Sequence, residues 1–432
     1  MTSDDTRHRE APYREAFVWV WLPGATQPVV AGRLDSIEGR LIFTYGRSYL
    51  ARPEAIALYL PELPLQAGPL PLLNGLAMPG AIRDAAPDAW GRRVIINRRL
   101  GAAARNVDPA HFDELTFLLE SGSDRIGAFD FQTSPTQYKP RETETATLDE
   151  LMDAAENVEN GVPLNPELDQ ALLHGSSIGG ARPKALIVDG AHKYIAKFSS
   201  QNDLYSVVKA EFCAMRLAAE CGIDAAPVRL THAAGKDVLL IQRFDRTRVA
   251  AGWRRHQMIS CLTLLELDEM NARYASYEDF ATVIRHRFVQ PKATLKELFA
   301  RLTFNVLCGN TDDHARNHAA FWNGSDLELT PAYDICPQAR SGGEAGQAML
   351  IHGNLNFSRI ELCLKSAASF LLSAEEAEAI VAHQVTTIRD RFDAVAVEAQ
   401  VSEVDRALMW RRQFLNPYAL QDAPKAIAGL VG

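Results

Sequence analysis

The sequence contains few cysteines, no long apolar run and no excess of basic residues. Its six cysteines include no C-x-x-C pair and no zinc-finger spacing, which favours buried thiols in a reducing cytoplasm over disulfide, redox or metal chemistry. No apolar stretch approaches membrane-spanning length and residues 1–15 lack an apolar signal core, so we expect a soluble, non-exported protein without membrane contact. The net charge of −9 argues against a broadly basic nucleic-acid surface.

The composition is that of a globular protein with several domains. The chain has 432 residues, of which 47% are hydrophobic and 23% are charged. A polar stretch at 133–147, rich in Thr, Pro, Glu and Lys, predicts the first domain boundary. We therefore predict an α+β protein with an N-terminal β-rich module (1–146), a small β-rich lobe (147–246) and a mainly helical lobe (247–432).

Hydrophobic periodicity and turn signals predict the individual elements. Alternating or β-branched runs indicate strands, while apolar residues that recur every three or four positions indicate helices. Ser373 and Glu376 have the spacing of a capping box at a helix start. The predicted strands lie at 17–22, 41–45, 185–188, 194–198 and 238–242, and the predicted helices lie at 88–100, 112–120, 208–219 and 295–308 and after 373.

One segment, 309–317, carries a dense group of polar residues. Asp312 and Asn317 are five positions apart, and Asp334 follows a predicted hairpin. A protein kinase arranges its catalytic base and two metal ligands in this order, and hard oxygen ligands suit Mg²⁺. The spacing predicts that Asp312 accepts a hydroxyl proton while Asn317 and Asp334 hold Mg²⁺ on ATP.

Other interpretations of the same segment stay open. Asp313 competes with Asp312 for the role of the base, and only the spacing favours Asp312. We expect His314 to orient the loop by hydrogen bonding rather than to transfer a proton. The mixture of acids and histidines also permits a metallohydrolase, whose ligands would be Asp312, Asp313, His314, His318 and Asp334.

Residues upstream of this segment supply candidates for nucleotide binding. Lys197 lies in a predicted strand, and Glu211 lies beside the buried stripe of the helix that follows. Kinases pair a strand lysine with the nucleotide phosphates and with a helix glutamate. A carboxylate at a packed face needs a partner, because burying it alone is costly. We therefore predict that Lys197 and Glu211 form an ion pair.

Two loops complete the predicted nucleotide site. The segment 176–184 contains Gly179 and Gly180, whose backbone N–H groups would cradle phosphate, although the order of a Walker A motif is missing. At the end of the small lobe, main-chain groups of Gln242 and Phe244 would meet the edge of an adenine. A simple turn and an ordinary linker are the alternatives for these two segments.

Together these segments resemble the HipA family, the serine/threonine kinase toxins of bacterial type II toxin–antitoxin pairs. The resemblance covers nearly the whole chain and includes 43–50, 88–92 and 124–129 of the N-terminal module. It implies a bilobal, protein-kinase-like fold that uses ATP and Mg²⁺ to phosphorylate a protein, with aminoacyl-tRNA synthetases among the family's substrates. It assigns phosphate contacts to the backbone from Ile178 to Ala181 and to Lys197.

The resemblance also implies how such a kinase is controlled. Ser177 corresponds to the serine that these kinases autophosphorylate, which pulls the glycine loop out and disables ATP binding; Ser176 is an adjacent alternative. A helix-turn-helix antitoxin of the HipB type would silence the kinase and make most of the contact with operator DNA. Gln242, where an acidic residue is frequent, and the stiff pair at 182–183 depart from the family pattern. A catalytically silent co-repressor remains a further alternative.

Overall fold

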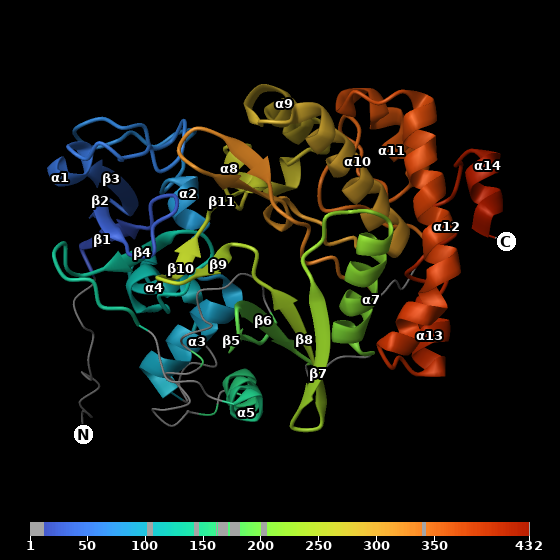
Figure 1. Ribbon diagram of the computed structural model, residues 1–432, viewed down its shortest axis with the longest axis horizontal. Helices are drawn as coiled ribbons and strands as arrows, with labels where there is room; N and C mark the ends of the chain where they lie inside the picture. Colours follow the sequence, from blue (N-terminus) through green and yellow to red (C-terminus); the bar gives the residue numbers. More distant parts are fainter. Residues whose placement is uncertain are drawn as a thin grey trace, which may run out of the picture. The chain divides into compact units, whose positions relative to one another are not determined.

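The computed structural model describes residues 13–101, 107–141, 147–160, 162, 172, 182–199, 205–338 and 343–431. The chain divides into two compact units, one formed by 1–185 with 249–255 and the other by 186–248 with 256–432. Both contain helices and sheets, as expected of an α+β protein (Figure 1). The predicted division at 146/147 and 246/247 stays a prediction.

The first unit is built on a four-stranded antiparallel sheet in the order β3-β2-β1-β4. Alternate residues of the strands point into the core, where Val18, Leu34, Phe43 and Phe131 are fully buried. The predicted strands at 17–22 and 41–45 and the helices at 88–100 and 112–120 are confirmed. The elements are β1 (Glu15–Val20), β2 (Val29–Ile37), β3 (Arg40–Tyr45), β4 (Phe129–Gln132), α1 (Arg47–Leu50), α2 (Gly80–Arg83), α3 (Ala89–Leu100), α4 (Glu114–Glu120) and α5 (Leu148–Glu159).

The second unit begins with a four-stranded sheet in the order β5-β6-β8-β7, next to which α7 packs (Figure 1). Gly190, with φ of +60°, forms the predicted turn between β5 and β6. In the antiparallel register of β6 and β8, Lys197 lies opposite Leu239. The elements are β5 (Lys184–Asp189), β6 (His192–Phe198), α7 (Val207–Glu220), β7 (Val228–Ala233) and β8 (Lys236–Gln242).

The rest of this unit is mainly helical. Helix α10 is its central element and contacts α7, α9, α11 and α12, and its stripe at Leu298, Phe299, Leu302 and Val306 is fully buried. Ser373 and Glu376 form the predicted capping box at the start of α12. The helices are α8 (Cys261–Leu264), α9 (Tyr277–Arg287), α10 (Pro291–Cys308), α11 (Ile360–Ser366), α12 (Ala374–Glu398), α13 (Glu403–Met409) and α14 (Lys425–Ala428).

Short strands connect this helical part to the candidate site. The strands β11 (Gln257–Ser260), β12 (Ala319–Trp322) and β13 (Leu327–Leu329) form an antiparallel sheet, so the predicted hairpin after residue 317 is confirmed. Two further strands, β9 (Arg246–Val249) and β10 (Gly252–Arg255), lie where the chain passes between the two units. Five of the six cysteines are buried, as expected of structural thiols. Within the described ranges, no helix is long and apolar enough to cross a membrane.

Candidate active site

A buried lysine joins two carboxylates in the second unit. Nζ of Lys197, on β6, lies 2.6 Å from Oε1 of Glu211 on α7, and the predicted ion pair is therefore present. The same Nζ also contacts Oδ1 of Asp334. The exposed fractions of the three side chains are 10% for Lys197, 2% for Glu211 and 37% for Asp334. Of the three, Asp334 has the most exposed side chain.

The two carboxylates keep the lysine charged. Burial alone would lower the pKa of the Lys197 ammonium, because it disfavours the charged form. The negative charges of Asp334 and Glu211 outweigh that effect and raise the pKa above its usual value. Lys197 is therefore a fixed positive charge at neutral pH.

Asp334 is held in place by its neighbours in the chain. Ala332 forms a parallel bridge with Ala225, and its N–H donates to the carbonyl of Asp224 over 2.7 Å. The hydroxyl of Tyr333 donates to the carbonyl of Arg316 over 2.7 Å, which ties this segment to the predicted catalytic loop. Asp334 itself has φ of +58°, a left-handed conformation that Asp tolerates better than most residues.

The predicted catalytic loop starts at a sharp helix end. Helix α10 stops at Gly309, whose φ of +77° places it in the left-handed region. A Cβ atom there would lie 2.8 Å from the carbonyl oxygen of Gln413, so glycine is required both for conformation and for space. The side chain of Asn310 then donates to that of Asn305 over 3.0 Å and fastens the start of the loop to the helix.

Main-chain contacts of Asp312 order the turn that follows. Its carbonyl accepts hydrogen bonds from the N–H of His314 at 2.9 Å and from Nδ2 of Asn317 at 3.2 Å. The Asp312 side chain is exposed, and among the described residues its carboxylate has no hydrogen-bond partner. His314 contributes through its main chain, since its buried Nδ1 likewise has no partner in the described part of the chain. An open carboxylate on an ordered backbone is suited to accept a proton.

Asp313, the competing candidate, lies in a different environment. Its side chain is 3% exposed, accepts a hydrogen bond from the hydroxyl of Tyr277 and lies 3.0 Å from Nε2 of His318. Both partners are themselves buried. Through these contacts Asp313 holds the loop on α9. Because its carboxylate is buried and engaged, the exposed Asp312 is the better candidate for the base. No local pattern identified Tyr277, because it is 36 positions away in the sequence.

At the predicted hinge, one main-chain group of Gln242 is already engaged. The N–H of Gln242 donates to the carbonyl of Pro227 over 2.9 Å, so this donor is not available to an adenine. The main chain of Phe244 makes no hydrogen bond within the described residues, and its ring packs 5.9 Å from Phe321 and 5.7 Å from Tyr333. Phe244 is therefore the better candidate for an adenine contact.

Buried ion pairs fix the hinge. Nε and Nη2 of Arg243 donate to the two carboxylate oxygens of Asp245 over 2.9 Å and 2.8 Å. Arg246 adds a contact of 2.9 Å to the same carboxylate. A bidentate guanidinium–carboxylate pair is geometrically restrictive, so this linker has a defined shape.

The metallohydrolase alternative and the glycine loop are the remaining predictions about the site. Across the described ranges, no three His, Cys, Asp or Glu side chains are grouped so that they could hold a metal ion, and the ligand cluster required by a metallohydrolase does not form. The oxygen donors of Asn317 and Asp334 are not affected by that finding. Residues of the predicted glycine loop lie outside the described residues: Ser176, Ser177, Ile178, Gly179, Gly180 and Ala181.

Family models match both parts of the chain. The HipA-like C-terminal domain matches residues 176–392, about half of the chain, and the HipA N-terminal domain matches 20–132. The chain belongs to the HipA family. The prediction from the motifs is thereby confirmed, including the kinase class and the α+β, kinase-like fold.

Several curated proteins resemble this HipA-family chain. A protein of Sinorhizobium fredii assigned as a kinase, Y4mE, is 28% identical over 340 residues, which are 73% of this chain and 76% of the relative. The serine/threonine-protein kinase toxin HipA of Shewanella oneidensis is 27% identical over 188 residues, 37% of this chain and 42% of that protein. The sequence alignment thus spans less than half of the length of the latter relative.

A solved structure agrees over a larger part of the chain. HipA of Shewanella oneidensis MR-1, in a complex with HipB and operator DNA, has a TM-score of 0.65 and 18% identity, covering 96% of each chain. At this identity the likeness establishes the fold. It does not carry over what the relative binds.

Proposed function

We propose that this chain is the toxin of a type II toxin–antitoxin pair and acts as an ATP- and Mg²⁺-dependent serine/threonine protein kinase. The observation that supports this most directly is the position of Lys197 between Glu211 and Asp334. A lysine that is kept charged by two carboxylates, one of them partly exposed, is suited to hold nucleotide phosphates.

The donor set fits a divalent cation. The carboxylates of Glu211 and Asp334 outnumber the Lys197 ammonium, which leaves one net negative charge at a site where Asp334 is partly exposed. Asn317 commits its amide nitrogen to the carbonyl of Asp312, so its amide oxygen is left to act as a ligand. When bound, Mg²⁺ would neutralise phosphate charge during transfer. Asn317 and Asp334 are the residues that would hold it.

Asp312 would accept the proton of the acceptor hydroxyl. Its carboxylate is exposed and would reach an incoming side chain without first breaking a contact within the described residues. Its main chain is fixed by His314 and Asn317, so little reorganisation is required. Phe244 would present its main-chain groups to the adenine. Asp313 would hold the catalytic loop on α9 through its contacts with Tyr277 and His318.

The finer assignments rest on the family resemblance. We propose Ser177 as the autophosphorylated residue, an aminoacyl-tRNA synthetase as the class of protein substrate, and a helix-turn-helix antitoxin of the HipB type as the partner. The solved relative binds HipB and operator DNA, which supports a similar complex. The net charge of −9 supports an operator contact made mainly by the antitoxin.

Phosphate transfer from labelled ATP tests this proposal. The intact chain is incubated with Mg²⁺, labelled ATP and a panel of purified aminoacyl-tRNA synthetases. We expect label on the chain and on one synthetase, and a loss of at least about 100-fold in the Asp334→Asn variant. Glu378→Gln, an exposed change on α12, is the matched control and should leave labelling unchanged. Nucleotide binding without any transfer would contradict the proposal and favour a silent co-repressor.

A further inference from the structure

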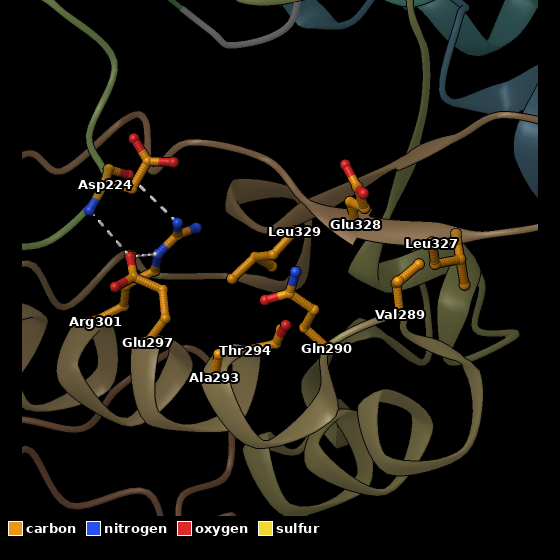
Figure 2. A pocket seen from close by; sticks show the side chains of 10 residues that line it. All are labelled: Asp224, Val289, Gln290, Ala293, Thr294, Glu297, Arg301, Leu327, Glu328 and Leu329. Atoms are coloured by element: carbon orange, nitrogen blue, oxygen red, sulfur yellow. Dashed lines mark hydrogen bonds and ion pairs between the residues drawn. The ribbon is translucent and has the colours of Figure 1, made fainter.

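A groove of about 310 Å³ lies on the helical part of the second unit, formed by α10, β13, residues 289–290 and Asp224. Its apolar lining comes from Val289, Ala293, Leu327 and Leu329. In Figure 2, Leu329 and Ala293 lie between Asp224 and Glu328, while Val289 and Leu327 lie at the end opposite Asp224. The catalytic assignments above leave this groove without a role.

An unsatisfied guanidinium group lines one end of the groove. The Arg301 side chain is 2% exposed; its Nε donates to Oε1 of Glu297 over 2.8 Å and its Nη2 to the carbonyl of Asp224 over 3.3 Å. Its Nη1 is buried and has no partner in the described part of the chain. In Figure 2 the guanidinium nitrogen without a dashed line points toward Leu329. A buried donor without an acceptor costs about 1–3 kcal/mol, so this nitrogen is a built site for an acceptor atom.

The charge of the groove restricts its ligand. Asp224, Glu297 and Glu328 against Arg301 leave a formal charge of −2. Glu297 is engaged by Arg301, whereas Asp224 and Glu328 are exposed. Such a surface repels phosphates and nucleic acid and attracts a basic ligand. The apolar side chains of Ala293 and Leu329, which lie between these two acids in Figure 2, favour apolar groups between the basic groups of the ligand.

We propose that the groove binds an extended segment of a protein in which apolar residues are flanked by lysine or arginine. The apolar side chains would pack on Ala293 and Leu329, a main-chain carbonyl would accept from Nη1 of Arg301, and the basic side chains would face Asp224 and Glu328. Non-polar anchors between charged ends are a common basis of peptide recognition.

The position of the groove suggests which protein supplies the segment. Strand β13 lies in the sequence between Asn317 and Asp334, the two proposed metal ligands. A segment held there would raise the local concentration of the rest of its protein near the site. We therefore assign the groove to docking of the acceptor protein. This assignment rests on the proposed kinase function, whereas binding of the segment does not.

Fluorescence anisotropy with a defined probe tests binding. The probe is a fluorescein-labelled peptide containing Lys-Leu-Ala-Leu-Lys, titrated with the intact chain in the absence of ATP. We expect Glu328→Lys to weaken binding at least about 10-fold and Ala293→Trp, which fills the groove, to abolish it. The matched controls Glu378→Lys and Ala379→Trp, at exposed positions on α12, should bind as the wild type does. Circular dichroism checks that each variant is folded.

Two outcomes would overturn the inference. One is equal binding by the wild type and by folded Glu328→Lys and Ala293→Trp, or no binding by any of them. The other is undiminished binding of a peptide whose leucines are replaced by serine, which would reduce the effect to simple charge attraction. Because no step uses ATP, the result is independent of whether the chain transfers phosphate. Attaching a serine to the probe then tests docking: Glu328→Lys should raise KM about 10-fold and leave kcat unchanged.

Discussion

Replacing the two adjacent acids of the catalytic loop one at a time should have different effects: one replacement should lower the rate of phosphate transfer and the other should lower stability. Asp312→Asn changes an exposed carboxylate that has no hydrogen-bond partner among the described residues. The free energy of unfolding should therefore change by no more than about 0.5 kcal/mol. The rate of phosphate transfer should fall by roughly 10²–10⁴, the usual contribution of a positioned general base.

Asp313→Asn should act on stability instead. The carboxylate of Asp313 is 3% exposed, accepts a hydrogen bond from the Tyr277 hydroxyl and lies 3.0 Å from Nε2 of His318. A hydrogen bond to a charged group contributes about 1.5–3 kcal/mol, and asparagine removes the charge that the Tyr277 hydroxyl donates to, so the loss should be on the order of 2 kcal/mol. Activity per folded molecule should fall less than in Asp312→Asn, because the proposed base is still present.

Three measurements on both variants decide between these roles. Urea unfolding gives the stability, hydrogen exchange at peptides covering 309–318 gives the local opening of the loop, and labelled ATP gives the transfer rate. We expect faster exchange only in Asp313→Asn. The reasoning is refuted if Asp313→Asn loses all transfer with unchanged stability while Asp312→Asn remains active, since the buried acid would then be the base.

Further predictions concern the ion pair, the helix end and a buried acid. Lys197→Met should lower the free energy of unfolding by about 3–5 kcal/mol, because it removes the cation beside buried Glu211, and adding Glu211→Gln should restore part of it in urea titrations. Gly309→Ala should lower the melting temperature more than Gly222→Ala, since both have positive φ but only Gly309 has a carbonyl oxygen 2.8 Å from the added Cβ. Glu62 is 4% exposed, and burial raises its pKa from 4.5 to about 7. The contribution of Glu62 to stability should therefore be greatest below pH 4.5 and fall by on the order of 3 kcal/mol between pH 4.5 and 7, so the difference in stability between the wild type and Glu62→Gln should change by that amount over this range.

Much of the fold could be predicted from local patterns. The stripe on α10 and the capping box of α12 involve residues within a few turns of one another, so periodicity was sufficient to find them. Strands β2 and β7 were not predicted. Gly32 interrupts β2, where a Cβ would lie 2.2 Å from the carbonyl oxygen of Thr44, and β7 is a half-exposed strand at the sheet edge. Both features weaken the alternation that indicates a strand.

The sequence by itself determined the order of the chemical groups: a strand lysine, a helix glutamate, and then Asp312, Asn317 and Asp334 at kinase spacing. Spacing along a chain is a local property and needs no packing to be recognised. Only the tertiary structure decided which of two adjacent acids is buried and that Lys197 reaches an acid 137 positions away. It also decided that the Gln242 N–H is already used. These facts depend on contacts between distant segments, which a pattern along the chain does not contain.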